Sequence, residues 1–334
     1  MSDHVPKTRV LSMSQVRDLL TIEDSIELQR QAFLAHARGQ TFSSPNSWLR
    51  LPGDQRGWLK LMSAYDETSG GLGVKLLARF PRNPPGRTLG SLLVLFDDQS
   101  GTPLAIMDSV FITAIRTAAG AALGTAALAR PEPKSIAMIG TGALAWFSLL
   151  SHRHLVPSVE NVVVYSRSAD NRESFVKRAE AETEISARSV SSVADAVDGA
   201  DVIITATNAP EPVLFGHHLS AGQHINAIGI RTEVSPDAVA ACRVFGDGRE
   251  ETLADGKFSV ALAAGAVTEA DLGPDLGEVL DGTAGRNDDH DITMFDSSGV
   301  AIQDLVCAMH VISAARQADV GTTVDLAGSD VLGF

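Results

Sequence analysis

The stretch at residues 135–145, SIAMIGTGALA, restricts the possible folds of this chain more than any other. Ser135 to Ile139 is a short apolar run of the kind that forms a buried parallel strand. Gly140, Gly142 and Ala145 then give the spacing G-x-G-x-x-A. In a dinucleotide-binding fold this spacing forms a tight strand-to-helix turn, whose backbone N–H groups meet a pyrophosphate. A glycine-rich turn that binds nothing has the same residues, so the sequence that follows has to decide.

After Pro133, short apolar segments alternate with helical segments. Strands are predicted at residues 135–139, 161–165, 201–205, 224–228, 244–245 and 292–295, and helices at 143–154, 171–181 and 193–197. This alternation predicts βαβ units, and hence a Rossmann-type α/β domain with a doubly wound parallel sheet. The glycine turn therefore has the context it needs. Its expected cofactor-binding residues are Gly140, Thr141, Gly142, Ala143 and Leu144.

The first part of the chain has a different pattern. Residues 10–40 look helical with a break near Thr21, where Thr21-Ile-Glu-Asp24 is a capping box. Strands predicted at 73–80, 92–96 and 104–107 are joined by turns, which indicates an antiparallel or mixed sheet. We predict a discontinuous α+β domain for substrate binding and dimerisation, formed by residues 1–117 and 312–334. Residues 118–311 form the predicted dinucleotide-binding domain.

Composition excludes several classes of partner. The chain has 334 residues and a net charge of −14, which argues against nucleic acid and anionic membrane surfaces. No run approaches the roughly 18 apolar residues of a membrane span, and no secretory signal is recognisable. Cys242 and Cys307 lie in apolar surroundings without metal-ligand spacing. We expect free thiols, no metal and a cytoplasmic location.

The end of the second predicted strand bears on the type of dinucleotide. NAD enzymes usually carry an Asp or Glu there for the ribose 2′-hydroxyl. Here the sequence is Ser166-Arg167-Ser168, and these side chains suit a 2′-phosphate. Alternatively, Arg167 stacks on the adenine and NAD binds. We expect NAD(P) as cofactor, with a lean toward NADP.

Basic residues within apolar segments are the candidate substrate groups. Arg50 and Lys75 lie in strand-like segments, where a solvated face is the ordinary interpretation. Arg116 lies at the start of an Ala-rich helix, where an unpaired charge would be costly. Its anionic partner is a structural carboxylate, a cofactor phosphate or a substrate carboxylate. Asp304, at the start of the last apolar helix, is either a favourable helix N-terminal charge or a pocket residue near the nicotinamide.

Taken together, several motifs resemble the ornithine cyclodeaminase/μ-crystallin family over nearly the whole chain. They are GVK at 73–75, TAIRTAA at 113–119, GTGALA at 140–145, ADVIITAT at 200–207, HINAIG at 224–229 and SGVAIQD at 298–304. The resemblance implies a homodimer of two-domain subunits with a nicotinamide cofactor.

The same resemblance also implies roles for single residues. It places Arg50, Lys75 and Arg116 around the α-carboxylate of a small amino or imino acid. It places Thr88 and Thr117 near the nicotinamide and its phosphates. The matching segments also add Thr207, Gly229 and Asp304 to the expected cofactor-binding residues.

One departure from the family pattern concerns the chemistry. Cyclodeaminases of this family carry an Asp in a longer loop after the HINAIG strand, where this chain has Arg231 in a shorter loop. Arginine stays protonated and cannot act as a base. Glu233 can substitute for the Asp only if the loop repositions it. We therefore predict an oxidoreductase that reduces a small α-imino acid by direct hydride transfer, or runs the reverse reaction.

In this hypothesis Arg50 and Arg116 hold the α-carboxylate, and Lys75 stands near the imine as a proton donor. Arg231 binds a distal acidic group, as in a dicarboxylic imine such as iminosuccinate. Two alternatives stay open: an ornithine or lysine cyclodeaminase-type lyase, and a non-catalytic NADPH-binding protein like μ-crystallin.

Overall fold

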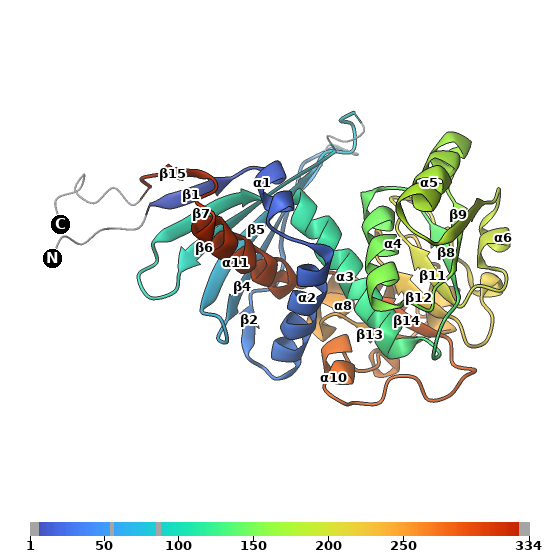
Figure 1. Cartoon of the computed structure of the whole chain (residues 1–334). Coiled ribbons are helices and arrows are strands. Elements are labelled where there is room, and N and C mark those ends of the chain that lie inside the picture. Colours follow the sequence, from blue (N-terminus) through green and yellow to red (C-terminus); the bar gives the residue numbers. More distant parts are fainter. Residues whose placement is uncertain (1–6, 54–56, 85–87, 327–334) are drawn as a thin grey trace. The chain divides into compact units, whose positions relative to one another are not determined.

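The computed structural model describes residues 7–53, 57–84 and 88–326 and divides into two compact units (Figure 1). The first unit comprises the chain up to Leu28, residues 38–116 and the chain from Val300 on. The second comprises residues 29–37 and 117–299. The prediction placed the return to the first domain at residue 312. The structure places it at Val300, because helix α11 (Ala301–Gln317) packs on the sheet of the first unit.

Within the described residues, the first unit contains a mixed sheet of eight strands. Its strands are β1 (Thr8–Leu11), β2 (Thr41–Ser43), β3 (Ser47–Arg50), β4 (Trp58–Asp66), β5 (Gly71–Arg79), β6 (Leu89–Asp97), β7 (Pro103–Asp108) and β15 (Thr322–Val324). They follow the order β15-β1-β7-β6-β5-β4-β2, and β3 pairs with β4. Strands β1 and β7 pair in parallel, and the other pairs are antiparallel. Helix α1 (Met13–Asp18) belongs to this unit, as does the first half of α2 (Ile22–Ala37), so the predicted α+β class is confirmed.

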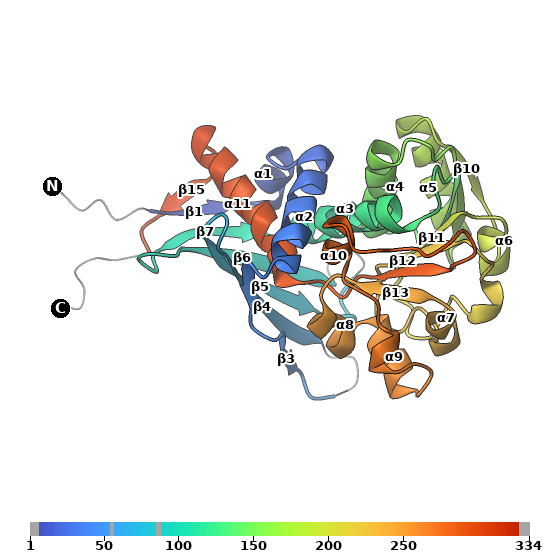
Figure 2. The same ribbon diagram turned by 90° about the horizontal axis from the view of Figure 1, so that it is seen from below.

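Two glycines in β5 allow α11 to lie close to this sheet. A Cβ atom at Gly71 would lie 3.1 Å from Met309 Cγ, and one at Gly73 would lie 3.1 Å from Leu305 Cδ1. Side chains alternate between the faces of a strand, so Lys75 lies on the same face as these glycines. Figures 1 and 2 show α11 running across this face. The close packing brings the first turn of α11 to Lys75.

In the part of the chain that the structure describes, the second unit has a sheet of seven strands, all parallel. Its strands are β8 (Ser135–Ile139), β9 (Asn161–Tyr165), β10 (Ser186–Ser189), β11 (Val202–Thr205), β12 (His224–Ala227), β13 (Arg243–Gly246) and β14 (Thr293–Asp296). Their order is β10-β9-β8-β11-β12-β14-β13. The strand order reverses between β8 and β11, which is the topological switch point of a doubly wound sheet. The Rossmann-type prediction is confirmed.

Helices cover both faces of this sheet (Figure 2). One face packs against α3 (Val110–Leu128), α4 (Ala143–Leu155) and α5 (Ala169–Glu182). The other packs against α6 (Val193–Val197), α7 (Pro236–Ala240) and α9 (Lys257–Ala263). The remaining helices are α8 (Arg249–Asp255), α10 (Leu276–Leu280) and two short 3₁₀ turns at Gly216–His218 and Glu269–Asp271. Because alternate residues of β8 enter the two cores, all four residues after Ser135 are apolar.

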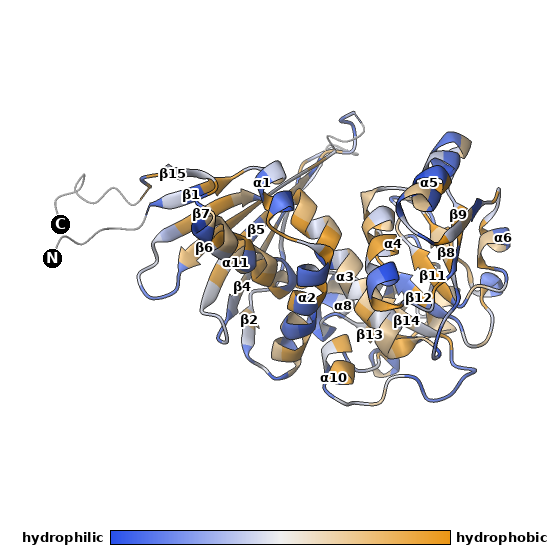
Figure 3. Cartoon of the chain, in the orientation of Figure 1, coloured by the Kyte–Doolittle hydropathy of each residue, from blue (hydrophilic) through white to orange (hydrophobic). Residues whose placement is uncertain are grey.

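Helix α3 departs from the expectation that no segment resembles a membrane span. Among the described residues it alone is long and apolar enough to cross a membrane, judged by length and composition (Figure 3). The core helices of water-soluble proteins also pass this test. In its most apolar window of 18 residues, 72% are buried within the protein. Its apolar composition is therefore accounted for by packing in the core.

Candidate functional site

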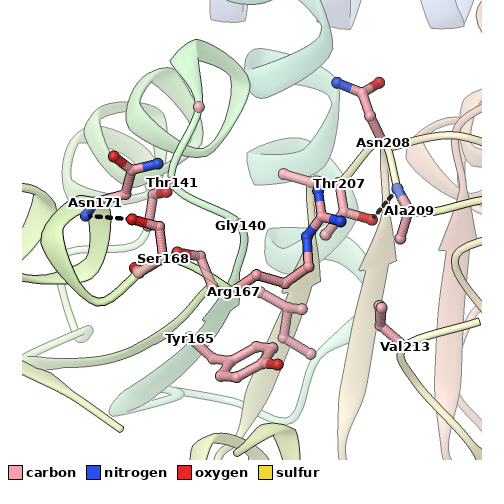
Figure 4. A pocket seen from close by; sticks show the side chains of 14 residues that line it. Gly140, Thr141, Tyr165, Arg167, Ser168, Asn171, Thr207, Asn208, Ala209 and Val213 are labelled. Atoms are coloured by element: carbon pink, nitrogen blue, oxygen red, sulfur yellow. Dashed lines mark hydrogen bonds between the residues drawn. The ribbon is translucent and has the colours of Figure 1, made fainter. Parts of the chain in front are cut away.

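A pocket of about 280 Å³ lies at the carboxyl ends of β8, β9 and β11 (Figure 4). This is the switch point of the sheet, where open α/β sheets bind their ligands. The pocket is lined by Ile139, Gly140, Thr141, Gly142, Tyr165, Ser166, Arg167, Ser168, Asn171, Ala206, Thr207, Asn208, Ala209 and Val213.

The two glycines of the turn after β8 serve different purposes. Gly140 has a φ of +123°, and a Cβ atom there would lie 2.4 Å from the Ala206 carbonyl oxygen, so the fold itself requires glycine. Gly142 has an ordinary φ of −82°, and apart from its immediate chain neighbours no protein atom lies within 4 Å of a Cβ built on it. It is also the N-cap of α4 and supplies no side-chain hydrogen bond to the first turn. The open space at Gly142 and the first N–H groups of α4 therefore fit a phosphate group.

The wall formed by the end of β9 is polar and basic. Ser168 caps α5 by accepting a hydrogen bond from Asn171 N, and Ser166 donates its hydroxyl hydrogen to the Ser168 carbonyl. Arg167 is exposed, and its side chain extends across the pocket toward Thr207 (Figure 4). None of the residues that line the pocket is an Asp or Glu. This wall suits a negatively charged group.

Seven of the predicted cofactor-binding residues line the pocket: Gly140, Thr141, Gly142, Ser166, Arg167, Ser168 and Thr207. Six do not: Thr88, Thr117, Ala143, Leu144, Gly229 and Asp304. The prediction missed the other residues of the lining, which are Ile139, Tyr165, Asn171, Ala206, Asn208, Ala209 and Val213. A usable signal was present for several of them, because Tyr165 ends β9 and Asn208 and Ala209 follow β11 closely.

A second candidate site is an ion-pair group in the first unit. Lys75 Nζ lies 2.7 Å from one carboxylate oxygen of Asp304, and Arg116 Nε lies 3.4 Å from the other. Arg116 also donates a hydrogen bond of 2.9 Å to the Gln303 side-chain oxygen. Lys75 is 2% exposed, Arg116 is 5% exposed and Asp304 is fully buried. In this group two buried cations share one carboxylate.

The surroundings of this group shift the pKa values of Lys75 and Asp304. Burial lowers the pKa of Lys75 to about 8, and the neighbouring Arg116 charge lowers it too, while Asp304 acts in the opposite direction. Burial by itself raises the pKa of Asp304, but the charges of Arg116 and Lys75 outweigh it and hold that pKa below its ordinary value. Asp304 is therefore ionised at neutral pH, and the Lys75 ammonium loses its proton at a pH close to the physiological value.

The structure does not bring Arg50 into this group. Arg50 ends β3, is exposed and lies with its guanidinium carbon 4.8 Å from the centre of the Trp48 ring. Lys60, which the prediction missed, is 4% exposed, and its Nζ lies 4.8 Å from the same ring. Its charge also lowers the Lys75 pKa. A signal for Lys60 existed in the alternation of side chains along β4. Lys60 stands at every second position with Met62 and Ala64, and so lies on the same buried face as they do.

Other predicted residues occupy different surroundings. Asp304, predicted either as a favourable charge at a helix N-terminus or as a pocket residue near the nicotinamide, lies in the first turn of α11 and contacts Lys75 and Arg116. Thr88 is half-buried and its carbonyl accepts a hydrogen bond from Phe80 N, and Thr117 is buried. Arg231 is exposed on the loop after β12. Glu233, two residues later, is fully buried with both carboxylate oxygens accepting hydrogen bonds.

The match to a known family extends over both sites. The model of the ornithine cyclodeaminase/mu-crystallin family matches residues 6–319. The chain belongs to this family. Solved structures that are similar to this chain include two reductases and a dehydrogenase. The Δ¹-pyrroline-2-carboxylate reductase of Thermococcus litoralis, in complex with NADH and L-proline, is 29% identical with a TM-score of 0.90, over 95% of this chain and 100% of that one.

Two further solved structures are similar over nearly their whole length. An archaeal alanine dehydrogenase, solved as a dimer with bound NAD, is 29% identical with a TM-score of 0.90, over 96% of this chain and 99% of that one. The iminosuccinate reductase of Paracoccus denitrificans, in complex with NAD⁺, is 28% identical with a TM-score of 0.87, over 96% of this chain and 100% of that one.

Proposed function

We propose that this protein is an NAD(P)H-dependent reductase of small α-imino acids. The observation that carries the proposal is the group of Lys75, Arg116 and Asp304, in which two buried cations share one carboxylate. Burying a cation without full compensation is costly. A substrate carboxylate supplies the missing negative charge, and a guanidinium binds a carboxylate through paired hydrogen bonds.

Each residue has a role in this proposal. Arg116 holds the α-carboxylate, and holding it fixes the position of the adjacent imine carbon. Lys75 donates a proton at the imine nitrogen, which its lowered pKa favours. Arg50 is proposed as a further carboxylate contact that moves from its place over Trp48. Asp304 keeps Lys75 oriented and protonated.

The dinucleotide supplies a hydride to the imine carbon when it is bound. Gly140, Thr141 and Gly142 would hold its phosphates at the start of α4, with Ala143 and Leu144 in the first turn. Thr207 would form the opposite wall, beside Asn208 and Ala209. The wall of Ser166, Arg167 and Ser168 would hold the adenosine ribose. Thr88, Thr117 and Gly229 stay as proposed contacts that lie outside the pocket wall.

For the substrate, we propose a dicarboxylic imine such as iminosuccinate. Its distal carboxylate would meet Arg231, as the sequence predicts. Lys60 adds a further buried ammonium on the face of the sheet that carries Lys75. A family member of similar structure is an iminosuccinate reductase. These observations favour an acidic side chain on the substrate over a cationic one.

The cyclodeaminase alternative needs Glu233 as a free base in place of the missing Asp. Glu233 is fully buried, and four hydrogen bonds occupy its carboxylate. The remaining alternative, an NADPH-binding protein without activity, gives no reason for a buried lysine whose pKa lies near 8. The reductase is therefore the function that the geometry favours.

We also propose that the protein is a homodimer. The face of the first sheet opposite Lys75 carries apolar side chains in register, with Leu61, Leu76 and Leu92 in one row. Leu61 is 36% and Leu92 48% exposed, which is unusual for a contiguous apolar row. In a two-fold symmetric dimer, this face would pack against the same face of a second copy of the chain. A cytoplasmic location stays a prediction; within the described residues, Cys242 and Cys307 are not joined in a disulfide.

The reductase activity is tested by mixing the protein with NADH or NADPH and a panel of α-imino acids. We expect one cofactor oxidised per imine reduced, and kcat/KM at least tenfold higher for dicarboxylic than for neutral imines. The variant Arg231→Asp should reverse this charge preference. Equal rates for acidic and neutral imines would refute only the distal-group proposal. Release of ammonia from ornithine or lysine without net cofactor consumption would refute the reductase.

The role of Lys75 is tested by the pH profile of kcat/KM at saturating cofactor. Above pH 8 the ammonium loses its proton, so kcat/KM should fall about tenfold per pH unit. The variant Lys75→Arg stays protonated, so its kcat should drop by roughly 10² to 10⁴ while this limb of the profile disappears. Titration of the substrate itself affects both proteins equally. If kcat/KM of the variant still falls above pH 8, then Lys75 is not the group whose titration causes the fall.

For cofactor preference we propose NADPH over NADH. Arg167 is part of the pocket wall and extends across the pocket, and the lining has no acidic residue. The variant Arg167→Ala should weaken NADPH binding roughly 10- to 100-fold, the size of a charge-assisted contact, and NADH binding less than threefold. Arg188→Ala, an exposed cation on the adjacent strand β10, is the control and should change neither. An equal loss for both dinucleotides would mean that Arg167 stacks on the adenine.

The dimer is tested by sedimentation of the purified protein. Its mass should be about twice the chain mass of 35.2 kDa. Leu92→Lys introduces a charge into the apolar row and should give a monomer, whereas Met13→Lys, at an equally exposed apolar residue on α1, should not. A dimer that survives Leu92→Lys places the interface elsewhere.

A further inference from the structure

The carboxylate of Glu233 is held in an unusually complete set of hydrogen bonds, all within the second unit. One oxygen accepts from the Thr205 hydroxyl at 2.8 Å and from Gly229 N at 2.6 Å. The other accepts from Thr207 N and from the Thr207 hydroxyl, both at 2.8 Å. We call this arrangement the Glu233 clamp. It joins the ends of β11 and β12 through one side chain.

The clamp connects two loops that are twenty residues apart in the chain. One is residues 206–209, which form a wall of the pocket, and the other is residues 229–233, which carry Arg231. Backbone contacts strengthen the connection, since Ile230 N donates to the Thr207 carbonyl and the Thr232 hydroxyl donates to the Ala209 carbonyl, both at 3.1 Å. The two loops are therefore held as a single body.

Steric packing shows that the clamp leaves no spare room. A Cβ atom on Gly229 would lie 2.2 Å from a carboxylate oxygen of Glu233 and 2.5 Å from the Thr207 carbonyl oxygen. Only glycine fits between the clamp and the wall of the pocket. Gly229, which the sequence analysis assigned to the cofactor, thus contacts Glu233. Neither residue is part of the pocket lining.

The hydrogen-bond pattern requires a carboxylate. Each oxygen faces one backbone N–H group, and an N–H group can only donate. A glutamine places its NH₂ against either Thr207 N or Gly229 N, and the threonine hydroxyls alone can turn to adapt. Burial raises the pKa of Glu233 above its ordinary value, while the charge of the buried Lys257 ammonium and the hydrogen bonds from Thr205 and Thr207 act in the opposite direction and favour the ionised carboxylate.

We propose that Glu233 is a positioning residue for the dinucleotide: its clamp holds Thr207 and the wall of residues 206–209 in the conformation that binds the cofactor. This inference rests on the proposed function, because it assigns the pocket to a dinucleotide. Glu233 acts without touching the ligand. Its effect is transmitted through the backbone of Thr207.

The test compares Glu233→Gln with Thr205→Val in the full-length protein. Thr205→Val removes one hydroxyl from the same carboxylate but leaves both backbone contacts and the pocket lining intact. Glu233→Gln should raise the Kd for the preferred dinucleotide at least tenfold, whereas Thr205→Val should change it less than twofold. Both should lower the temperature of thermal unfolding. An unchanged Kd in Glu233→Gln, or an equal rise in both variants, would overturn the proposal.

Amide hydrogen exchange tests the clamp independently of ligand binding. In the wild-type protein the amides of Thr207 and Gly229 should exchange at least a hundredfold more slowly than that of Asn208, which is exposed. If Glu233→Gln does not fold, Gly229→Ala displaces the carboxylate from the other side and should raise the Kd in the same way. Fast exchange at both amides would refute the clamp. Slow exchange in a protein that binds no dinucleotide would support the clamp and refute the proposed function.

Discussion

A fully buried carboxylate needs compensation from cations or from hydrogen-bond donors, and Asp304 obtains it from Lys75 and Arg116. The three residues come from α11, β5 and α3, which are distant in the chain. Removing one partner of such a buried group typically costs about 3–5 kcal/mol. The small residues at 71 and 73 of β5 allow the helix to come near enough for the contact. The packing of the first unit and its candidate substrate group thus depend on the same interaction.

The parallel sheet was predictable because its signals are local. Strands β8 and β9 and helix α6 have the predicted bounds, since each is a short apolar segment between polar turns. The capping box at Thr21 also forms, with reciprocal hydrogen bonds to Asp24 that start α2. Two edge strands were missed, whereas the edge strand β13 was predicted at residues 244–245. Strands β10 and β15 are polar and short, and only pairing with a neighbouring strand makes them strands.

The candidate sites also contain residues that the sequence could predict and residues that it could not. The glycine turn and the segment after β9 were predictable, because parallel strands place their carboxyl ends at one edge. The pairing of Lys75 with Asp304 spans 229 residues, and nothing near either residue indicates it. The resemblance grouped Arg50 with Lys75 and Arg116, but in this structure Arg50 lies over Trp48. The burial of Lys60 follows from strand alternation, which the prediction did not apply to β4.

The Glu233 clamp has a consequence for how the family can diversify. It fixes Gly229 and Glu233, where the loop after β12 starts and ends, while Arg231 between them is exposed. Residues inserted beside Arg231 would extend outward without loosening either anchor, since the carboxylate and the two backbone amides would keep their places. The loop can therefore change its length and charge while the wall of the pocket stays in place. If Arg231 meets the substrate as proposed, a change in this loop would alter the substrate range without altering dinucleotide binding.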